Sequence, residues 1–159
     1  MKRLTLLALA IAPFAATSAV AAPASVFLKK AAQGDQSEVT LGNLAAQRGA
    51  FAGVRDYGRR LASDHGGHLG QVQSLAGRMH IRLPGGMKPD ARAAYRQLQR
   101  LRGRAFDRMF VRHMIADHRA DIGEYQMQAR TGDRETAALA RATLPTLREH
   151  LRIAQRLSR

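Results

Sequence analysis

Two segments of this sequence place a histidine within an apolar helical stripe. In "MIADH" (residues 114–118) His118 follows Met114 by four residues, and in "LASDH" (residues 61–65) His65 follows Leu61 by the same step. Residues four apart lie on one face of a helix, so each imidazole faces the same way as its apolar neighbours. An aspartate directly precedes each histidine. A polar group on a core-facing stripe needs a partner when it is buried.

Glu38 and His150 extend this pattern to two further segments. Glu38 lies seven residues from an alanine on either side, and His150 lies three residues after Leu147. Glu38 lies about 11 residues before the first predicted turn and His65 about 15 after it, while His118 lies about 13 before the last turn and His150 about 18 after it. All four side chains therefore reach one layer of the protein if its two halves dock in register.

These four side chains suit a divalent metal ion. Neutral imidazole and carboxylate are ordinary ligands for Zn, Fe, Mn and Cu, and helical bundles build metal sites from ligands that point inward from facing helices. We therefore predict a metal site formed by Glu38, His65, His118 and His150. Two alternatives stay open: each histidine is an ordinary core residue, or the four form a purely structural cluster of glutamate and protonated histidines.

Six further polar residues are predicted to support or supplement this site. The acid before each histidine lies about 100° around the helix from it, so it can orient a histidine on a neighbouring helix as a hydrogen-bond acceptor. Pairing of these acids with the many arginines is an equal alternative. His68 shares the stripe of His65, and His113 and Asp121 flank Asp117 at four-residue spacing, as a second, peripheral site would require. The auxiliary set is Asp64, His68, His113, Asp117, Asp121 and Glu149.

Helices are the elements that must position these residues. Apolar residues recur at three- and four-residue steps, and no segment alternates convincingly with period two. We expect long helices at about 25–47, 51–80 and 104–129, with Ser25 as the first N-cap, and a last one capped by Asp133 and ending at Leu157. "RLPGGMKP" (residues 82–89) is turn-rich, and a short helix follows it at about 90–101. The predicted fold is all-α: a four-helix bundle with a short extra helix in the central crossover link.

The start of the chain has the pattern of a secretory signal peptide. Lys2 and Arg3 precede an apolar run, and "AVA" (residues 19–21) offers small residues for cleavage before Ala22. An uncleaved membrane anchor is the alternative. The sequence has no cysteine, which excludes a lipobox, disulfides and thiolate ligands. We predict a signal peptide at residues 1–21 and one domain at residues 22–159, periplasmic or secreted, with no transmembrane segment after cleavage.

The chain is strongly basic, with 26 Lys and Arg against 12 Asp and Glu and a formal net charge of +14. Arginines recur every four residues from Arg92 to Arg112. A solvated arginine-rich face is the simplest explanation, and adhesion to anionic envelope surfaces is a secondary property that it would confer. Export, and the lack of aromatic residues between the arginines, argue against nucleic acid as a partner. Nothing in the sequence indicates an oligomeric state.

Several segments together resemble the DUF4142 family of exported bacterial proteins. They are "FLKKAAQGDQSEVTLGNLAAQ" (residues 27–47), "LASDH", "FDRMFVRHMIADH" (residues 106–118) and "TLPTLREHLRIAQ" (residues 143–155). The resemblance implies a ferritin-like arrangement of two helix pairs and no settled activity. The Glu-x-x-His pairs of di-iron carboxylate proteins are absent, so ferroxidase or oxygenase chemistry does not follow from such a fold. The residues that resemble the family's polar signature are Glu38, Asp64, His65, Asp117, His118 and His150.

Three functions are compatible with these patterns. The first is an exported bundle that binds one divalent metal ion in its core for storage, sensing or structure. The second is a non-enzymatic envelope or stress protein whose buried polar layer only fixes the register of the helices. A metal-dependent enzyme ranks last, because no nucleophile elbow, phosphate loop or hydrolase-like carboxylate pair is present.

Overall fold

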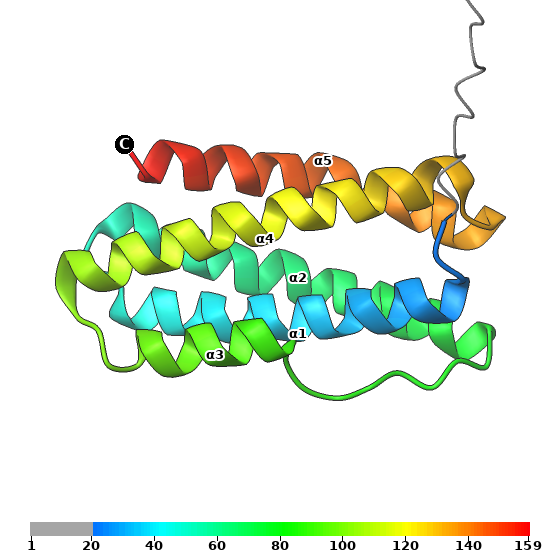
Figure 1. Ribbon diagram of the computed structural model, residues 1–159, viewed down its shortest axis with the longest axis horizontal. Helices are drawn as coiled ribbons and strands as arrows, with labels where there is room; N and C mark the ends of the chain where they lie inside the picture. Colours follow the sequence, from blue (N-terminus) through cyan, green and yellow to red (C-terminus); the bar gives the residue numbers. More distant parts are fainter. Residues whose placement is uncertain (1–20) are drawn as a thin grey trace, which may run out of the picture.

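The computed structural model describes residues 21–159 and contains five helices and no strand in this range (Figure 1). The helices are α1 (Ala24–Arg48), α2 (Ala52–Arg78), α3 (Pro89–Leu98), α4 (Gly103–Thr131) and α5 (Arg134–Leu157). The all-α prediction is confirmed, and each predicted helix is present with ends within a few residues of those expected. The signal peptide predicted at residues 1–21 lies outside the described residues, apart from Ala21. No described helix is long and apolar enough to span a bilayer.

Local sequence explains where the first and last helices begin. Asp133 caps α5 as predicted, since its side chain accepts hydrogen bonds from the backbone N–H groups of Glu135 and Thr136. The prediction of Ser25 as the cap of α1 is wrong. This helix begins one residue earlier, behind Pro23, whose carbonyl accepts the first backbone hydrogen bonds. Proline suits a helix start because its φ is already near the helical value and it has no N–H that needs a partner.

The four long helices form two antiparallel pairs, α1 with α2 and α4 with α5 (Figure 1). The link after α2 and the short helix α3 return along α1, so α4 starts at the end of the molecule where α2 started. The two pairs face one another through contacts of α2 with α5 and of α1 with α4. This topology brings α2, α4 and α5, which carry the three candidate histidines, to a common interior.

Two glycines let α1 and α2 approach unusually closely. A Cβ on Gly42 would lie 2.7 Å from the carbonyl oxygen of Gly58, and a Cβ on Gly58 would lie 2.5 Å from the carbonyl oxygen of Gly42. These distances are too short for any residue with a side chain, so both positions require glycine. Gly42 lies one helical turn after Glu38. The close contact at Gly42 therefore determines how near the polar residues of α1 lie to α2.

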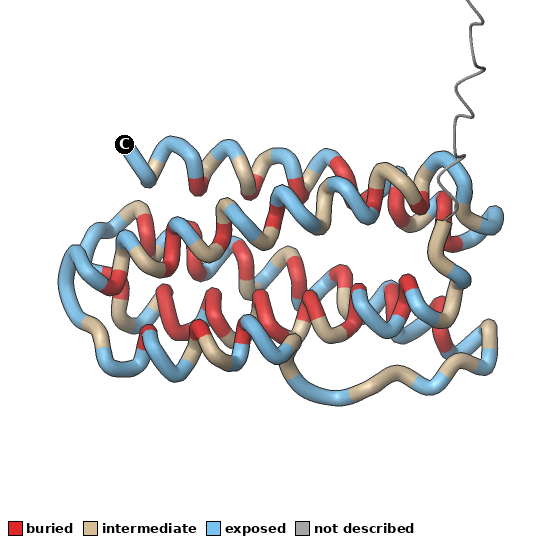
Figure 2. Tube along the Cα trace, viewed as in Figure 1, coloured by how far each residue is buried: buried red, intermediate tan, exposed pale blue. Residues whose placement is uncertain are grey.

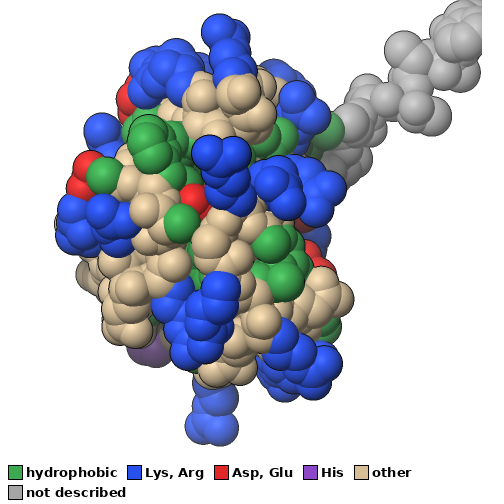
Figure 3. All heavy atoms as spheres, turned by 90° about the vertical axis from the view of Figure 1, so that its left-hand side faces the viewer, with side chains coloured by type: hydrophobic (Ala, Val, Ile, Leu, Met, Phe, Trp, Pro, Cys, Tyr) green, Lys and Arg blue, Asp and Glu red, His purple; other side chains and the backbone are tan. Residues whose placement is uncertain are grey.

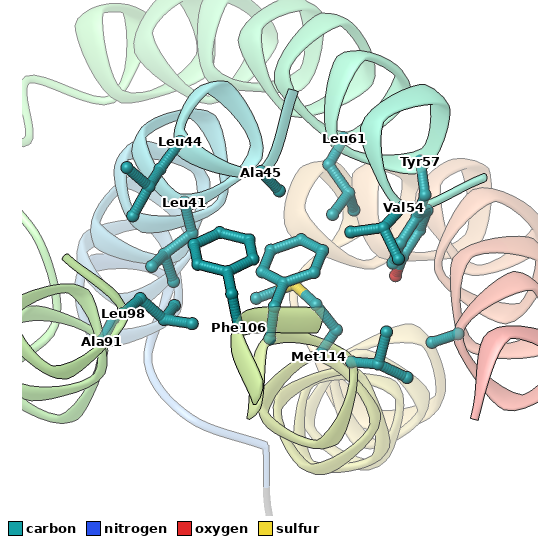
Figure 4. Close-up of a cluster of buried hydrophobic side chains, with 13 residues drawn as sticks. Leu41, Leu44, Ala45, Val54, Tyr57, Leu61, Ala91, Leu98, Phe106 and Met114 are labelled. Atoms are coloured by element: carbon teal, nitrogen blue, oxygen red, sulfur yellow. The ribbon is translucent and has the colours of Figure 1, made fainter. Parts of the chain in front are cut away.

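Buried residues lie along the inward faces of the helices over the whole length of the molecule (Figure 2). The apolar ones among them form two clusters. The cluster nearer the α1–α2 turn contains Leu41, Leu61 and Met114, which pack around Phe106 (Figure 4). The second cluster lies toward the other end and contains Val72, Leu147 and Tyr125, among others. Along each long helix the candidate ligand falls between members of the two clusters. The polar residues therefore form a buried layer that apolar side chains enclose from both ends.

Candidate metal centre

Three imidazoles from three different helices meet in this buried layer. His65 of α2, His118 of α4 and His150 of α5 each offer a ring nitrogen that lies within 4.8 Å of the other two. Their exposed fractions are 5%, 0% and 0%. The ring centroids of His150 lie 5.3 Å from those of both other histidines. Nε2 of His118 and Nδ1 of His150 are 3.3 Å apart.

The second nitrogen of each ring faces an oxygen that can only accept a hydrogen bond. Nδ1 of His65 lies 2.9 Å from Oδ1 of Asp35, Nδ1 of His118 lies 3.0 Å from the Met114 carbonyl oxygen, and Nε2 of His150 lies 2.9 Å from Oδ2 of Asp64. Because carboxylates and carbonyls lack a proton to give, these three ring nitrogens carry the hydrogen. The other nitrogen of each neutral ring then holds a lone pair: Nε2 of His65, Nε2 of His118 and Nδ1 of His150.

Burial favours the neutral form of two of these imidazoles, those of His118 and His150. It lowers the pKa of His118 to about 3, and the nearby rings of His65 and His150 act in the same direction. Burial also lowers the pKa of His150, although its hydrogen bond to Asp64 works against this change. A neutral imidazole is the form that binds a metal ion.

No donor among residues 21–159 is directed at the inward lone pairs. Nε2 of His65 is buried without a hydrogen-bond partner within the described residues. Two facing lone pairs at 3.3 Å, those of His118 and His150, repel one another unless a cation lies between them. Tetrahedral coordination with metal–nitrogen bonds of ~2.0–2.1 Å separates ligand nitrogens by ~3.3–3.4 Å. The residues present therefore fit a divalent metal ion.

Asp35 contacts this cluster, although it was not among the site residues predicted from the sequence. Its carboxylate is 3% exposed, and it holds two histidines, with Oδ1 at 2.9 Å from Nδ1 of His65 and Oδ2 at 2.8 Å from Nδ1 of His68. His68 thus shares the carboxylate that orients His65, and its ring packs against Tyr125 at 5.9 Å between centroids. The signal in the sequence was the three-residue step from Asp35 to Glu38, which places both acids on one face of α1.

Glu38 lies on the opposite edge of His118 from the other two imidazoles. Its Oε1 is 3.5 Å from Nδ1 of His118, whereas Nε2 of that ring faces His150. Glu38 belongs instead to a second group with Asp117 and His118, whose potential ligand atoms lie within 4.8 Å of one another. Of the four predicted ligands, His65, His118 and His150 therefore lie together. Glu38 lies next to His118, on the side of its ring that faces away from the other two histidines.

Burial raises the pKa of Glu38 well above its usual value, and the neighbouring carboxylates of Asp117 and Asp121 raise it further. Both carboxyl oxygens of Glu38 are buried without a hydrogen-bond partner among the described residues. Burial also favours the neutral form of Asp117, but the neighbouring carboxyl group of Glu38 and the ammonium of Lys88 outweigh this effect and lower the pKa of Asp117 to about 2. The raised pKa favours a neutral Glu38 beside an ionised Asp117. The ammonium of Lys88 lies 3.2 Å from this carboxylate and balances its charge.

Lys88 is the second residue that the sequence analysis missed, because it lies in the link before α3 that was predicted as a turn. Its Nζ lies 3.2 Å from Oδ1 of Asp117 and 3.1 Å from Oδ1 of Asp121. Burial works against the charged lysine, but the two carboxylates raise its pKa overall. Burial and the charge of Asp117 raise the pKa of Asp121 to about 6. The ion pair fastens the crossover link to α4.

The remaining predicted residues lie apart from the histidine cluster. Glu149 pairs with Arg152 and Arg156 on the exposed side of α5. His113 is half-buried and belongs to neither of the two groups of potential metal ligands. An open cavity of about 330 Å³ leads from the surface to His65, one of the three clustered histidines. Its lining includes Asp35, His65, His68, Lys88, Asp117 and Asp121.

Fold and site together define an all-α protein with a buried three-histidine cluster. The sequence matches the family model "Domain of unknown function (DUF4142)" over residues 10–157, and the chain belongs to this family. A comparison with curated proteins finds no match.

Solved structures show the same fold at low sequence identity. A DUF305 fragment from Deinococcus radiodurans is 21% identical, with a TM-score of 0.76, over 88% of this chain and 98% of that one. CopM in its Cu(II)-bound form is 14% identical, with a TM-score of 0.73, over 87% of this chain and 97% of that one. CopM in the apo form is 16% identical, with a TM-score of 0.68, over 84% and 94%. The DUF305 fragment and CopM therefore share the helical arrangement of this chain.

Proposed function

We propose that this chain is an exported metal-binding protein that holds one divalent transition-metal ion between His65, His118 and His150. The observation that carries this proposal is the set of three inward lone pairs, each fixed by an oxygen acceptor on the far side of its ring. Such acceptors orient metal-binding histidines and raise their basicity. In this arrangement Glu38 lies beside Nδ1 of His118, on the side of the ring away from the ion, and is not a ligand.

The donor set indicates which class of ion would bind. Three imidazole nitrogens favour Cu(II) or Zn(II) over Mn(II), and over Mg(II) or Ca(II), which prefer oxygen. CopM, whose fold is similar, has been solved with Cu(II) bound, which supports a copper-type ion as the first to test. Fe(II) and Mn(II) are expected to bind more weakly in the order that divalent ions generally follow. Storage, sensing or transfer of the ion suits this site better than catalysis.

The topology and the chain start support two further parts of the proposal. The antiparallel pairs α1–α2 and α4–α5, joined by a long crossover, suit a ferritin-like four-helix bundle. The basic and apolar start followed by "AVA" (residues 19–21) suits a cleaved signal peptide and hence a periplasmic or secreted protein.

The direct test is metal content and thermal stability of the chain from Ala22 onward, purified without a histidine tag. We expect about one Cu(II) or Zn(II) per chain, and a rise in melting temperature on the order of 5–10 °C when metal is in about hundredfold excess over its dissociation constant. A chelator should reverse the rise.

Two variants remove ligand atoms while they keep the outer hydrogen bonds. His65→Asn retains an N–H toward Asp35 in place of Nδ1 but lacks Nε2, and His150→Gln retains an N–H toward Asp64 but lacks Nδ1. Each should lose the metal-induced stabilisation, whereas His80→Asn, at an exposed position at the end of α2, should retain it. A chain that stays metal-free, with a melting temperature that Cu(II) and Zn(II) leave unchanged, would show that the cluster is purely structural.

A further inference from the structure

Most of the excess positive charge of this protein lies at one end. The end formed by the α1–α2 turn, the start of α4 and the chain terminus comprises residues 48–60, 99–112 and 152–159, and these contain twelve arginines and two aspartates. Figure 3 views this end and shows blue basic side chains around most of it, with far fewer red acidic ones. We call it the arginine-rich end. An anionic partner is attracted to such a surface from a distance.

An apolar groove opens at the arginine-rich end. It has a volume of about 450 Å³, and Val54, Val111 and Leu157 contribute to its lining. Phe51 lies at its edge and is 62% exposed, which makes it one of two large apolar side chains on the surface of the described residues; the other is Val26, at 42%. An apolar groove with a protruding aromatic residue is a feature of surfaces that contact a partner.

The backbone holds Phe51 in this exposed position. Oδ1 and Oδ2 of Asp107 accept hydrogen bonds from the N–H groups of Ala50 and Phe51, both at 2.9 Å. Nη1 of Arg55 donates to the carbonyl oxygens of Gly49 and Ala50, both at 2.8 Å. The acid in the groove is thus engaged in fixing the turn, and the phenyl ring is presented on a rigid support.

The arginines around the groove are free to bind an anion. Arg104, Arg108 and Arg112 follow one another at four-residue steps along α4, and Arg159 completes the lining. All four are exposed, and none takes part in an ion pair among residues 21–159, unlike Arg59, Arg152 and Arg156. Guanidinium groups match the geometry of phosphate.

We infer that the arginine-rich end docks onto the surface of an anionic phospholipid bilayer. The arginines contact lipid phosphates, and Phe51 enters the boundary between headgroups and acyl chains, beside the apolar groove. Basic residues near a bilayer each strengthen binding about fivefold, and an inserted aromatic side chain adds apolar burial. A nucleic acid fits less well, because the arginine-rich end presents one exposed aromatic ring and no row of rings for base stacking.

A tryptophan probe tests the position of the docking surface. The sequence contains no tryptophan, so Phe51→Trp introduces a single fluorophore that reports its own surroundings. The protein used is the chain from Ala22 onward, which retains all five helices and both apolar clusters and lacks the apolar leader. Vesicles of phosphatidylglycerol in phosphatidylcholine should shift the emission of this variant to the blue. They should not shift that of the matched Val26→Trp variant, and pure phosphatidylcholine should shift neither.

Charge and apolar contributions are separated by vesicle co-sedimentation. Replacing Arg104, Arg108 and Arg112 by Gln should weaken binding on the order of a hundredfold, and Phe51→Ser should weaken it about tenfold. The matched controls are Arg82, Arg130 and Arg134 replaced by Gln, and Val26→Ser, all toward the opposite end. Added salt should weaken binding.

Three results would overturn the inference. Equal losses from the two triple-arginine variants would mean that net charge alone attracts the protein to the vesicles. Equal blue shifts at positions 51 and 26 would mean that the arginine-rich end has no special orientation toward the bilayer. Tighter binding to a DNA duplex, or to inorganic phosphate alone, than to anionic vesicles at the same salt would assign the surface to a different ligand.

Discussion

Nε2 of His118 and Nδ1 of His150 lie 3.3 Å apart, and the opposite nitrogens of the two rings face the carbonyl oxygen of Met114 and the carboxylate of Asp64. The outer oxygens therefore determine which nitrogen of each ring is deprotonated, and both deprotonated nitrogens point inward. The antiparallel pairing of α4 with α5 creates this relationship, and α2 supplies the third nitrogen and the Asp64 carboxylate. In the proposed metal site, residues outside the ligand set therefore orient the ligands.

Asp64 is expected to tune metal affinity through His150. Asp64→Ala removes the acceptor for Nε2–H of His150, so metal affinity should fall about 10–100-fold while the number of ions bound at saturation stays the same. Isothermal titration calorimetry with Cu(II) or Zn(II) measures both the affinity and the number of ions bound. Glu149→Ala is the matched control, since this acid is adjacent to His150 in sequence but pairs with exposed arginines. Equal affinities for the two variants would show that Asp64 has no such role.

Lys88 is expected to contribute to stability through Asp117 and Asp121. Lys88→Met keeps much of the apolar stem but leaves two half-buried carboxylates without their cation, which should lower the free energy of unfolding by ~2–4 kcal/mol. Urea unfolding measures this change. Asp121→Asn in the Lys88→Met background should recover part of the loss, because it removes one of the unpaired charges. Additive effects of the two substitutions would contradict this account.

Glu38 is expected to make stability depend on pH. Its pKa is raised in the folded protein above the usual 4.5, so the folded state binds one more proton than the unfolded state from about pH 4.5 upward. This contribution is fully present below pH 4.5 and is lost as pH rises toward the folded-state pKa. Relative to Glu38→Gln, which stays neutral, the metal-free native chain should therefore lose ~1.4 kcal/mol per pH unit across this window. Urea unfolding at several pH values checks the slope, and parallel curves would mean that Glu38 is ionised in the folded protein.

Alanine substitutions at two glycines of α2 should change stability in opposite directions. Gly58→Ala places a Cβ 2.5 Å from the carbonyl oxygen of Gly42, so α1 and α2 must separate and the free energy of unfolding should fall by more than ~2 kcal/mol. Gly67→Ala meets no atom within 4 Å and should raise it by ~0.5–1 kcal/mol, because alanine favours the helix. Thermal unfolding of both metal-free variants distinguishes them. A stable Gly58→Ala variant would show that the close contact of α1 with α2 is dispensable.

The sequence by itself determined the helices and the level of the polar layer. The three- and four-residue steps around His65, His118 and His150 depend on helix geometry alone, and Asp133 is a local cap whose partners lie within three residues. Short turns and the long central link then indicated which helices pair. These features are readable because each depends on residues close together in the chain.

Only the tertiary structure decided which nitrogens and oxygens meet. In the folded chain, Glu38 lies beside the outer nitrogen of His118. Asp35 forms hydrogen bonds with both His65 and His68. Lys88, in the link before α3, forms ion pairs with Asp117 and Asp121. The periodicity of apolar residues predicts on which face of a helix a side chain lies, to within a fraction of a turn. Whether two side chains share a proton or a metal ion depends on ångström-scale distances set by packing, such as the close approach of α1 to α2 at Gly42 and Gly58.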